Sequence, residues 1–401
     1  MIDITLIGMR RRINLNSFYY YNPTKLVFGK DSVSRITESL PEHVKKLLLH
    51  YGGGSIKRSG LYDQIMKILK EKDIEVVEFS GVTPNPKLSL VREGIKLCKE
   101  EKVDFILAVG GGSVIDSSKS IAAGVYAEGD VWDLYVQGKA LTKALPIGVV
   151  LTISASGSES SNATIITNEE TKQKLGLEDD LLRPKFAILN PELTLTLSER
   201  QTFAGAVDIL SHVMERYFTN TENVELTDNL CEGTMRAVIS NAYKLLENPN
   251  DYNARAEIML CGTMAHSGIL GLGRDEDWAS HRIGHEITAL YGTTHGVTLA
   301  MILPAWMKYV YKKNIDRFVQ FAKNVFNIDA ESKTDEEVAL TGIERFEEFL
   351  KDINIPVKLK DEGIPYDQFE LMAEKCTKNG TVGRFVKLDK SAVLGILELA
   401  K

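Results

Sequence analysis

Short apolar runs alternate with amphipathic stretches along the first half of the chain, from Lys25 to about Leu197. A short apolar run bounded by turn residues is typical of a buried strand, whereas apolar residues three and four positions apart are typical of a helix. The alternation of the two predicts a parallel sheet with helices on both faces. The predicted strands are residues 44–50, 74–79, 105–109, 147–151 and 186–189, and the predicted helices are residues 61–70, 88–101 and 114–126.

Beyond Ser198 the pattern changes, because the strand-like runs stop and apolar residues recur every three or four positions. This spacing predicts amphipathic helices without further strands. We therefore expect an α/β N-terminal domain with a Rossmann-like parallel sheet over residues 17–198, then an all-helical C-terminal domain over residues 199–401. Residues 1–16 are expected to form an N-terminal extension. The helices predicted in the second domain are residues 203–218, 226–246, 253–270 and 315–326.

The composition of the 401 residues, 44% hydrophobic and 26% charged, is that of a globular protein. The net charge is −7 and charges of both signs are interspersed, so no basic stripe is present to attract nucleic acid or an anionic membrane. No uninterrupted apolar run reaches the roughly 18 residues that a membrane-spanning helix needs. The four cysteines are scattered without a paired framework, which is typical of a reducing compartment. We expect a cytoplasmic protein without nucleic-acid or membrane partners.

A glycine-rich turn, Gly110-Gly111-Gly112-Ser113, joins a predicted strand directly to a predicted helix. Glycines let the backbone approach an anion closely, and the first N–H groups of the helix carry the positive end of its dipole. The turn is therefore suited to a pyrophosphate, although tight packing alone also requires glycine. Asp116 and Lys119 follow in the helix, at positions from which polar groups reach a ribose or a phosphate.

A second glycine turn, Gly52-Gly53-Gly54-Ser55, follows the first of the predicted strands. A site for NAD(H) usually ends this strand with an acid that accepts a hydrogen bond from the 2′-hydroxyl of the ribose. No acid stands at this turn, and the cations Lys57 and Arg58 come directly after it. The local chemistry therefore favours NADP(H) over NAD(H), with two solvated basic residues at a helix start as the alternative.

Histidines concentrate in the second half of the chain. Asp208 and His212 are four residues apart, as are His281 and His285, so each pair shares one face of a helix. Asp208 has apolar neighbours on both sides, and a buried carboxylate requires a cation or several donors. A carboxylate with several imidazoles suits Fe²⁺ or Zn²⁺. The spacing alone does not tell which histidine lies outside such a site. The histidines in this region are His212, His266, His281, His285 and His295.

At these residues the chain resembles the iron-containing, or group III, alcohol dehydrogenases, and within them the butanol dehydrogenase-like branch. The resemblance covers nearly the whole chain from Tyr19 onward. It implies the fold shared by dehydroquinate synthase and these dehydrogenases, and a homodimer. Its motifs are Gly110-Gly111-Gly112-Ser113-Val114-Ile115-Asp116, Asp208-x-x-x-His212-x-x-Glu215, and Asp277-Trp278-Ala279-Ser280-His281-Arg282-Ile283-Gly284-His285 followed by Thr294-His295-Gly296.

The resemblance also implies a role for individual residues. The metal ligands of the family correspond to Asp208, His212, His281 and His295, whereas His285 corresponds to the position beside the substrate and is expected to pass a proton. The string Thr152-Ile153-Ser154-Ala155-Ser156 departs from the family's usual one. The implied cofactor-binding residues are Gly52, Gly53, Ser55, Gly111, Gly112, Ser113, Asp116, Thr152, Ser156, Ser158 and Lys174.

The expected activity is that of a metal-dependent alcohol dehydrogenase or aldehyde reductase. It would move a hydride between NAD(P)(H) and a short-chain primary alcohol or aldehyde such as butanol or butanal, with one Fe²⁺ or Zn²⁺ ion. The alternatives are oxidation of a polyol, as by glycerol dehydrogenase, a lyase of the dehydroquinate synthase type, and a binding protein without activity. A lyase of this type would have several basic residues to anchor its substrate, whereas residues 278–295 contain a single cation, Arg282.

Overall fold

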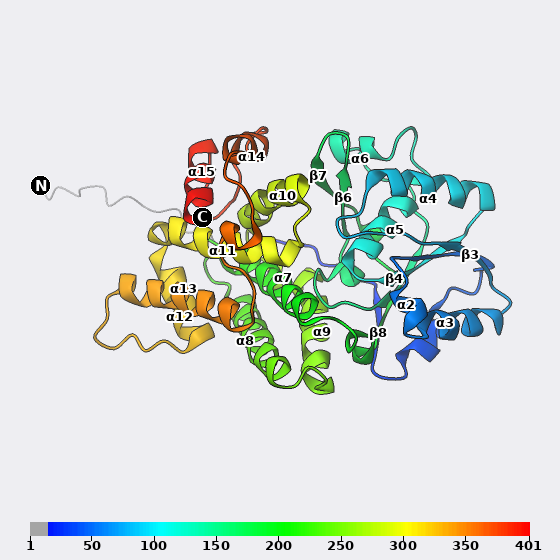
Figure 1. Cartoon of the computed structure of the whole chain (residues 1–401), viewed down its shortest axis with the longest axis horizontal. Coiled ribbons are helices and arrows are strands. Elements are labelled where there is room, and N and C mark those ends of the chain that lie inside the picture. The colour runs from blue at the N-terminus through cyan, green and yellow to red at the C-terminus, as the bar shows by residue number, and fades with distance from the viewer. Residues whose placement is uncertain (1–14) are drawn as a thin grey trace, which may run out of the picture.

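A six-stranded parallel sheet forms the first half of the molecule, which we describe from a computed structural model covering residues 15–401 (Figure 1). Its strands lie in the order β1-β8-β5-β4-β2-β3. The central strands are buried on both faces, as uninterrupted apolar runs require. The strands are β1 (Lys25–Phe28), β2 (Lys46–Tyr51), β3 (Glu75–Phe79), β4 (Phe105–Gly110), β5 (Ile147–Leu151) and β8 (Phe186–Leu189).

Helices cover both faces of this sheet. Apolar side chains that alternate along β4 enter two cores: Ile106 packs with the α4 side, whereas Phe105 and Leu107 pack with the α3 side. Helix α3 supplies its apolar residues at intervals of four, which places them on the face that meets the sheet. On one face lie α1 (Ile36–Ser39), α2 (Ser55–Arg58) and α3 (Leu61–Lys70), and on the other α4 (Leu88–Glu101), α5 (Gly112–Gly124) and α6 (Trp132–Gln137).

An antiparallel hairpin of β6 (Ala163–Asn168) and β7 (Gln173–Glu178) stands outside the main sheet. The sequence pattern predicted neither of these strands, and it also missed β1. The hairpin packs against α5 on one side and its β7 contacts α10 of the helical half. At its tip the Lys172 carbonyl accepts a 2.7 Å hydrogen bond from Nζ of Lys375. The hairpin therefore touches both halves of the molecule.

Helices make up the second half, as predicted. Helix α7 starts where the strand pattern ends, because Ser198 and Gln201 form a reciprocal capping box. The predicted helix 253–270 is wrong at its end, since Gly268 has a φ of 97° and breaks it after His266. The helices are α7 (Glu199–Tyr217), α8 (Glu225–Glu247), α9 (Tyr252–His266), α10 (Ala279–Tyr291), α11 (His295–Val310), α12 (Ile315–Phe326), α13 (Asp335–Asp352), α14 (Phe369–Cys376) and α15 (Lys390–Leu399).

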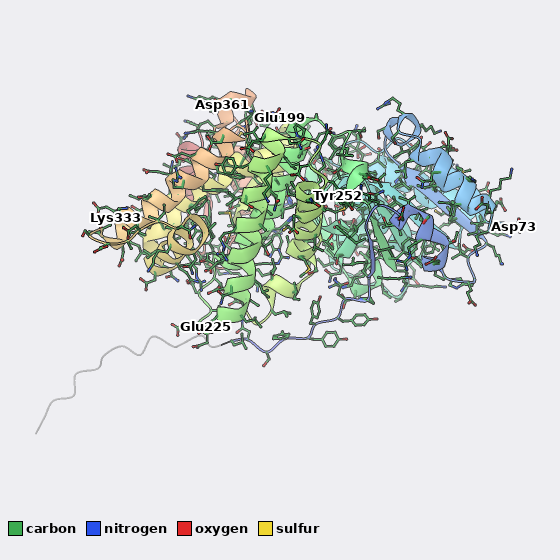
Figure 2. The ribbon with its side chains drawn as sticks, turned by 90° about the horizontal axis from the view of Figure 1, so that it is seen from below. Asp73, Glu199, Glu225, Tyr252, Lys333 and Asp361 are labelled. Atoms are coloured by element: carbon green, nitrogen blue, oxygen red, sulfur yellow. The ribbon has the colours of Figure 1, made fainter. Side chains whose placement is uncertain are left out.

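The two halves lie side by side, with Asp73 at the outer end of the sheet half and Lys333 at the outer end of the helical half (Figure 2). The predicted extension over residues 1–16 falls mainly on residues 1–14, which lie outside the described residues. Asn16 donates its backbone N–H to the Gly273 carbonyl of the helical half. The division at residue 198 stays a prediction about domains. Within residues 15–401 no helix is long and apolar enough to cross a membrane.

Candidate functional site

A cleft of about 1590 Å³ separates the carboxyl ends of the parallel strands from the starts of α10 and α11. Ligands in open α/β sheets bind at this edge, because the loops that follow parallel strands meet there. Every residue that the family resemblance implied for the metal, the cofactor or proton transfer lines this one cleft. The structure therefore brings the predicted glycine turns and the predicted metal residues into a single site.

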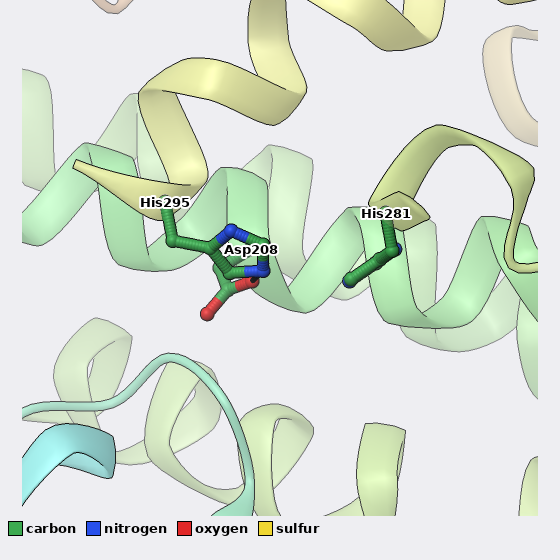
Figure 3. Close-up of side chains that lie close together, drawn as sticks. All are labelled: Asp208, His281 and His295. Carbon is green, nitrogen blue, oxygen red and sulfur yellow. Dashed lines mark ion pairs between the residues drawn. The ribbon is translucent and has the colours of Figure 1, made fainter. Parts of the chain in front are cut away.

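Three of the predicted metal residues converge from three different helices (Figure 3). Asp208 lies in the middle of α7, whereas His281 and His295 lie in the first turns of α10 and α11. Each offers one ligand atom, and these atoms lie within 4.8 Å of one another. This arrangement of one carboxylate and two imidazoles suits a divalent ion that prefers oxygen and nitrogen ligands.

His212, the fourth predicted ligand, lies beside this group without being part of its closest set. It follows Asp208 by one helical turn, and its Nδ1 lies 3.9 Å from Oδ1 of Asp208. Its ring centre is 4.8 Å from that of His281. The fourth imidazole is therefore adjacent to the three, and its role as a ligand stays a prediction.

The chemistry of these four side chains fits a bound cation. Asp208 Oδ1, His212 Nδ1, His281 Nε2 and His295 Nδ1 are buried without a hydrogen-bond partner, which is costly unless an ion binds there. Burial raises the pKa of Asp208 to about 6 and lowers the pKa of His212 and His295 well below the usual range. Imidazoles that resist protonation keep their lone pairs available to a metal.

Glu215 orients one of these imidazoles, a role that the sequence motif contained but did not disclose. Its Oε1 accepts hydrogen bonds from Nδ1 of His281, at 2.7 Å, and from the His281 backbone N–H, at 3.0 Å. Because a carboxylate accepts at Nδ1, the lone pair of His281 is on Nε2, the orphaned atom that faces the cleft.

Gly296 explains why a glycine follows His295. A Cβ atom at this position would lie 1.9 Å from the Ala204 carbonyl oxygen of α7. Only glycine lets α11 start so close to α7. With the two helices this close, Nε2 of His295 lies 3.8 Å from Oδ1 of Asp208.

The glycine turn after β4 is built for close approach of a ligand. Gly111 is the N-cap of α5, so the first free N–H groups of the helix open into the cleft. A Cβ on Gly112 would lie 2.3 Å from Oγ of Ser156, which belongs to the loop after β5. Glycine at position 112 is therefore required by close packing against this loop, and the backbone of the turn lines the cleft, where a pyrophosphate could meet the N–H groups of the helix start.

Asp116 and Lys119 behave differently from the expectation that both reach a ligand. Asp116 borders the cleft, but it also accepts hydrogen bonds from Ser158 Oγ at 2.6 Å and from the Ile165 N–H at 3.2 Å. The expectation for Lys119 is wrong, because its side chain has no exposed surface and does not line the cleft. Its Nζ lies 2.7–3.2 Å from five oxygens of Ser158, Ser161 and Ala163.

Lys174, on β7, brings a cation to the middle of the cleft. Its Nζ donates to Oδ1 of Asn85 at 3.0 Å. Burial lowers the pKa of Lys174 to about 8, while the carboxylates of Asp208 and Asp116 act in the opposite direction. A lysine charged at neutral pH between the metal residues and the pyrophosphate turn is suited to hold a polar part of the cofactor.

The two cations after the Gly52–Ser55 turn do not have equal surroundings. Nζ of Lys57 lies 2.6 Å from Oε1 of Glu78, and this carboxylate also accepts a hydrogen bond from Tyr62. Arg58 instead lies over the turn, where its Nη1 is 2.9 Å from the position of a Cβ on Gly54. Neither cation lines the cleft itself, whereas Gly52, Gly53 and Ser55 do.

Comparisons with known proteins cover both halves of this architecture. Residues 23–191 match the model of the iron-containing alcohol dehydrogenase family, and residues 202–401 match that of the C-terminal part of Fe-containing alcohol dehydrogenases. The chain belongs to the iron-containing alcohol dehydrogenase family. The predicted family and the predicted fold class are confirmed.

Named relatives of this iron-containing alcohol dehydrogenase align over nearly its full length. A probable NADH-dependent butanol dehydrogenase of Bacillus subtilis is 46% identical over 386 residues, which are 96% of this chain and 99% of the relative. An NADPH-dependent aldehyde reductase of Escherichia coli is 37% identical, with 91% and 94% covered. The crystal structure of an NADH-dependent butanol dehydrogenase of Thermotoga maritima superposes with a TM-score of 0.93 at 43% identity, with 96% and 99% covered. The chain is therefore an alcohol dehydrogenase, and its family implies a divalent metal and a nicotinamide cofactor.

Proposed function

We propose that this chain interconverts short-chain primary alcohols and aldehydes such as butanol and butanal, with NAD(P)(H) as the hydride carrier. One observation carries the proposal: a single cleft joins the Gly110–Ser113 turn to Asp208, His281 and His295. A dinucleotide bound along the sheet edge would bring its nicotinamide toward the metal residues. The names of the relatives, butanol dehydrogenase and aldehyde reductase, support this substrate class.

Each part of the cleft has a separate task in this reaction. Asp208, His212, His281 and His295 hold the ion, and the glycine turn with Lys174 holds and orients the dinucleotide. When bound, a divalent ion polarises the substrate oxygen as a Lewis acid, and the nicotinamide ring gives or takes the hydride. One carboxylate and three imidazoles are ligands that suit both Fe²⁺ and Zn²⁺.

His285 is the residue that we assign to proton transfer. It lies one turn after His281 on α10 and lines the cleft, and its Nε2 is buried without a hydrogen-bond partner. Burial lowers the pKa of His285 well below the usual range, so the imidazole is neutral and its unpartnered nitrogen can accept a hydrogen bond from an alcohol.

Replacing His285 with asparagine is expected to keep the metal and to slow turnover. The asparagine retains a polar group but cannot relay a proton, and such catalysis contributes about 10²–10⁴-fold. Elemental analysis and kcat for butanal reduction measure the two effects together. A kcat of the variant equal to that of the wild type at every pH from 6 to 9 would show that His285 has only a packing role.

The preference between NADP(H) and NAD(H) is proposed to depend on Arg58. Glu78 already neutralises Lys57, whereas Arg58 lies over the turn beside the adenosine end of the cleft. This arrangement supports NADP(H), although some relatives are named NADH-dependent. The R58A variant is expected to lose about tenfold in kcat/KM with NADPH relative to NADH, the loss of one charge-assisted hydrogen bond. A ratio equal to that of the wild type would remove Arg58 from cofactor recognition.

The proposed function is tested by NAD(P)H oxidation with butanal after loading with Fe²⁺ or Zn²⁺. Parallel reactions with glycerol and NAD(P)⁺, and with the substrate of a dehydroquinate synthase-type lyase, cover the alternative activities. Oxidation of NAD(P)H by butanal that disappears with a chelator supports the proposal, whereas turnover of glycerol alone would contradict it. A homodimer and a cytoplasmic location stay predictions, for which size-exclusion chromatography and fractionation are the measurements.

A further inference from the structure

Trp278, the residue directly before α10, has a backbone conformation that is rare for a bulky side chain. Its φ of 64° and ψ of 11° lie in the left-handed region. The other non-glycine residues with positive φ in the described part of the chain are aspartate, asparagine, lysine and serine residues. Bulky residues persist in this region only where their surroundings hold them, and such residues gather at functional sites.

Buried hydrogen bonds hold the backbone of Trp278 in this conformation. The preceding carboxylate, Asp277, accepts from the backbone N–H groups of Arg384 at 2.6 Å, Phe385 at 2.8 Å and Ala279 at 3.3 Å. Three donors on one buried carboxylate fix the turn that leads into α10. The strained residue is therefore tied on one side to the C-terminal loop and on the other to the helix that presents His281.

The indole of Trp278 is locked as firmly as its backbone. Its Nε1–H donates to Oε2 of Glu276 at 2.7 Å, and Oε1 of the same carboxylate lies 3.2 Å from Nε of Arg216. The Arg216 guanidinium lies 4.8 Å from the centre of the indole, a cation–π contact. A Cβ on Gly271 would lie 2.0 Å from Oε1 of Glu276, so the space for this ion pair depends on that glycine.

This locked ring is a wall of the cleft next to the metal residues. The indole is half-buried and lines the cleft. Its centre lies 5.0 Å from the ring of His281, 5.9 Å from that of His212 and 5.8 Å from that of His266. The neighbouring residues on this wall are charged or imidazole-bearing. The indole is therefore a large aromatic surface within reach of a substrate whose oxygen lies at the metal residues.

We propose that the carbon chain of the substrate lies against the indole of Trp278, and that this residue sets the preference for butanal-sized substrates over smaller ones. Glu276 and Arg216 are positioning residues, because they hold the indole without facing the reacting atoms. The inference rests on the proposed function, which places the substrate oxygen beside His281. Each additional methylene on such a wall is worth about 10-fold or more in discrimination.

The W278N variant separates the ring from the backbone. Asparagine adopts the left-handed conformation readily, so the turn is retained while the indole is removed. The measurement is kcat/KM of the metal-loaded enzyme for acetaldehyde, butanal and hexanal with a saturating nicotinamide cofactor. Because butanal has two methylenes more than acetaldehyde, the ratio of butanal to acetaldehyde is expected to fall by about 100-fold, mainly through a higher KM for butanal. A ratio equal to that of the wild type would overturn the proposal.

Two further variants distinguish a substrate wall from a merely structural tryptophan. W132F changes a tryptophan of α6 that does not line the cleft, and its ratio is expected to equal that of the wild type. E276Q keeps an oxygen for the indole N–H but removes the charge facing Arg216, and it is expected to lower the ratio by less than W278N. An equal loss for all three aldehydes together with loss of metal in W278N would overturn the proposal. Wild-type enzyme that oxidises no NAD(P)H with any aldehyde would instead refute the proposed function.

Discussion

Replacing His281 with alanine is expected to remove the bound metal and about three orders of magnitude of kcat, the rate equivalent of about 4 kcal/mol. The lone pair on His281 Nε2 is one of the orphaned atoms of the cluster, and Glu215 aims it. The next histidine of α10, His285, lies a full turn away from it. Elemental analysis and butanal-dependent NAD(P)H oxidation on the same preparation measure both losses.

Two further variants make this prediction specific. D208N removes the charge of the cluster with little change of shape and keeps the hydrogen bonds between Glu215 and His281. It is expected to lose the metal, and that loss cannot be due to a disturbed Glu215. His43 is exposed before β2, and H43A is expected to keep both metal and turnover. Full metal occupancy in H281A would show that the cluster does not bind the ion as assigned.

Replacing Lys119 with methionine is expected to destabilise the sheet half by about 3–5 kcal/mol, because five oxygens lose their donor in a buried place. For a unit of this size, a 3 kcal/mol loss lowers Tm by roughly 6–12 °C. Burial lowers the pKa of Lys119 to about 8, so the ammonium is still charged at neutral pH. The same segment carries Ser158, which bonds Asp116, so the KM for the dinucleotide is expected to rise as well.

Calorimetry and cofactor titration measure these two effects of K119M. The matched control is Lys96, an exposed lysine on the neighbouring α4 whose ion pair with Glu100 spans 3.8 Å. Exposed pairs contribute about 0–1 kcal/mol, so K96M is expected to leave Tm nearly unchanged. Equal Tm values for K119M and K96M would show that the buried contacts of Lys119 make no net contribution to the free energy of unfolding.

The sequence was sufficient wherever burial and hydrophobicity coincide. Strands such as β4 are apolar throughout, and the parallel sheet follows from their alternation with helices. The hairpin strand β6 was not predicted, because its buried positions include the polar residues Thr164 and Asn168. Burial alternates along this strand, but hydrophobicity does not. The helix over residues 253–270 was extended too far, since a single glycine inside an apolar pattern does not announce a break.

The candidate site shows the same division between local and long-range information. Spacing brought Asp208 and His212 together, because four residues make one helical turn. It could not show that Lys119 is buried among oxygens of residues 158–163, since these partners begin 39 residues further along the chain. The roles of Glu215 and Trp278 depend likewise on contacts between α7, the turn before α10 and the C-terminal loop.

The β6–β7 hairpin limits how the two halves can move. Lys119 fastens its first residue, Ala163, to the sheet half, and Lys375 holds its tip at Lys172 from the helical half. A hinge motion that widened the cleft would have to bend this strap or break the hydrogen bond at its tip. The lysine that holds the tip also pairs with Glu286, the residue after His285, at 2.9 Å, so the same side chain connects the hairpin to α10.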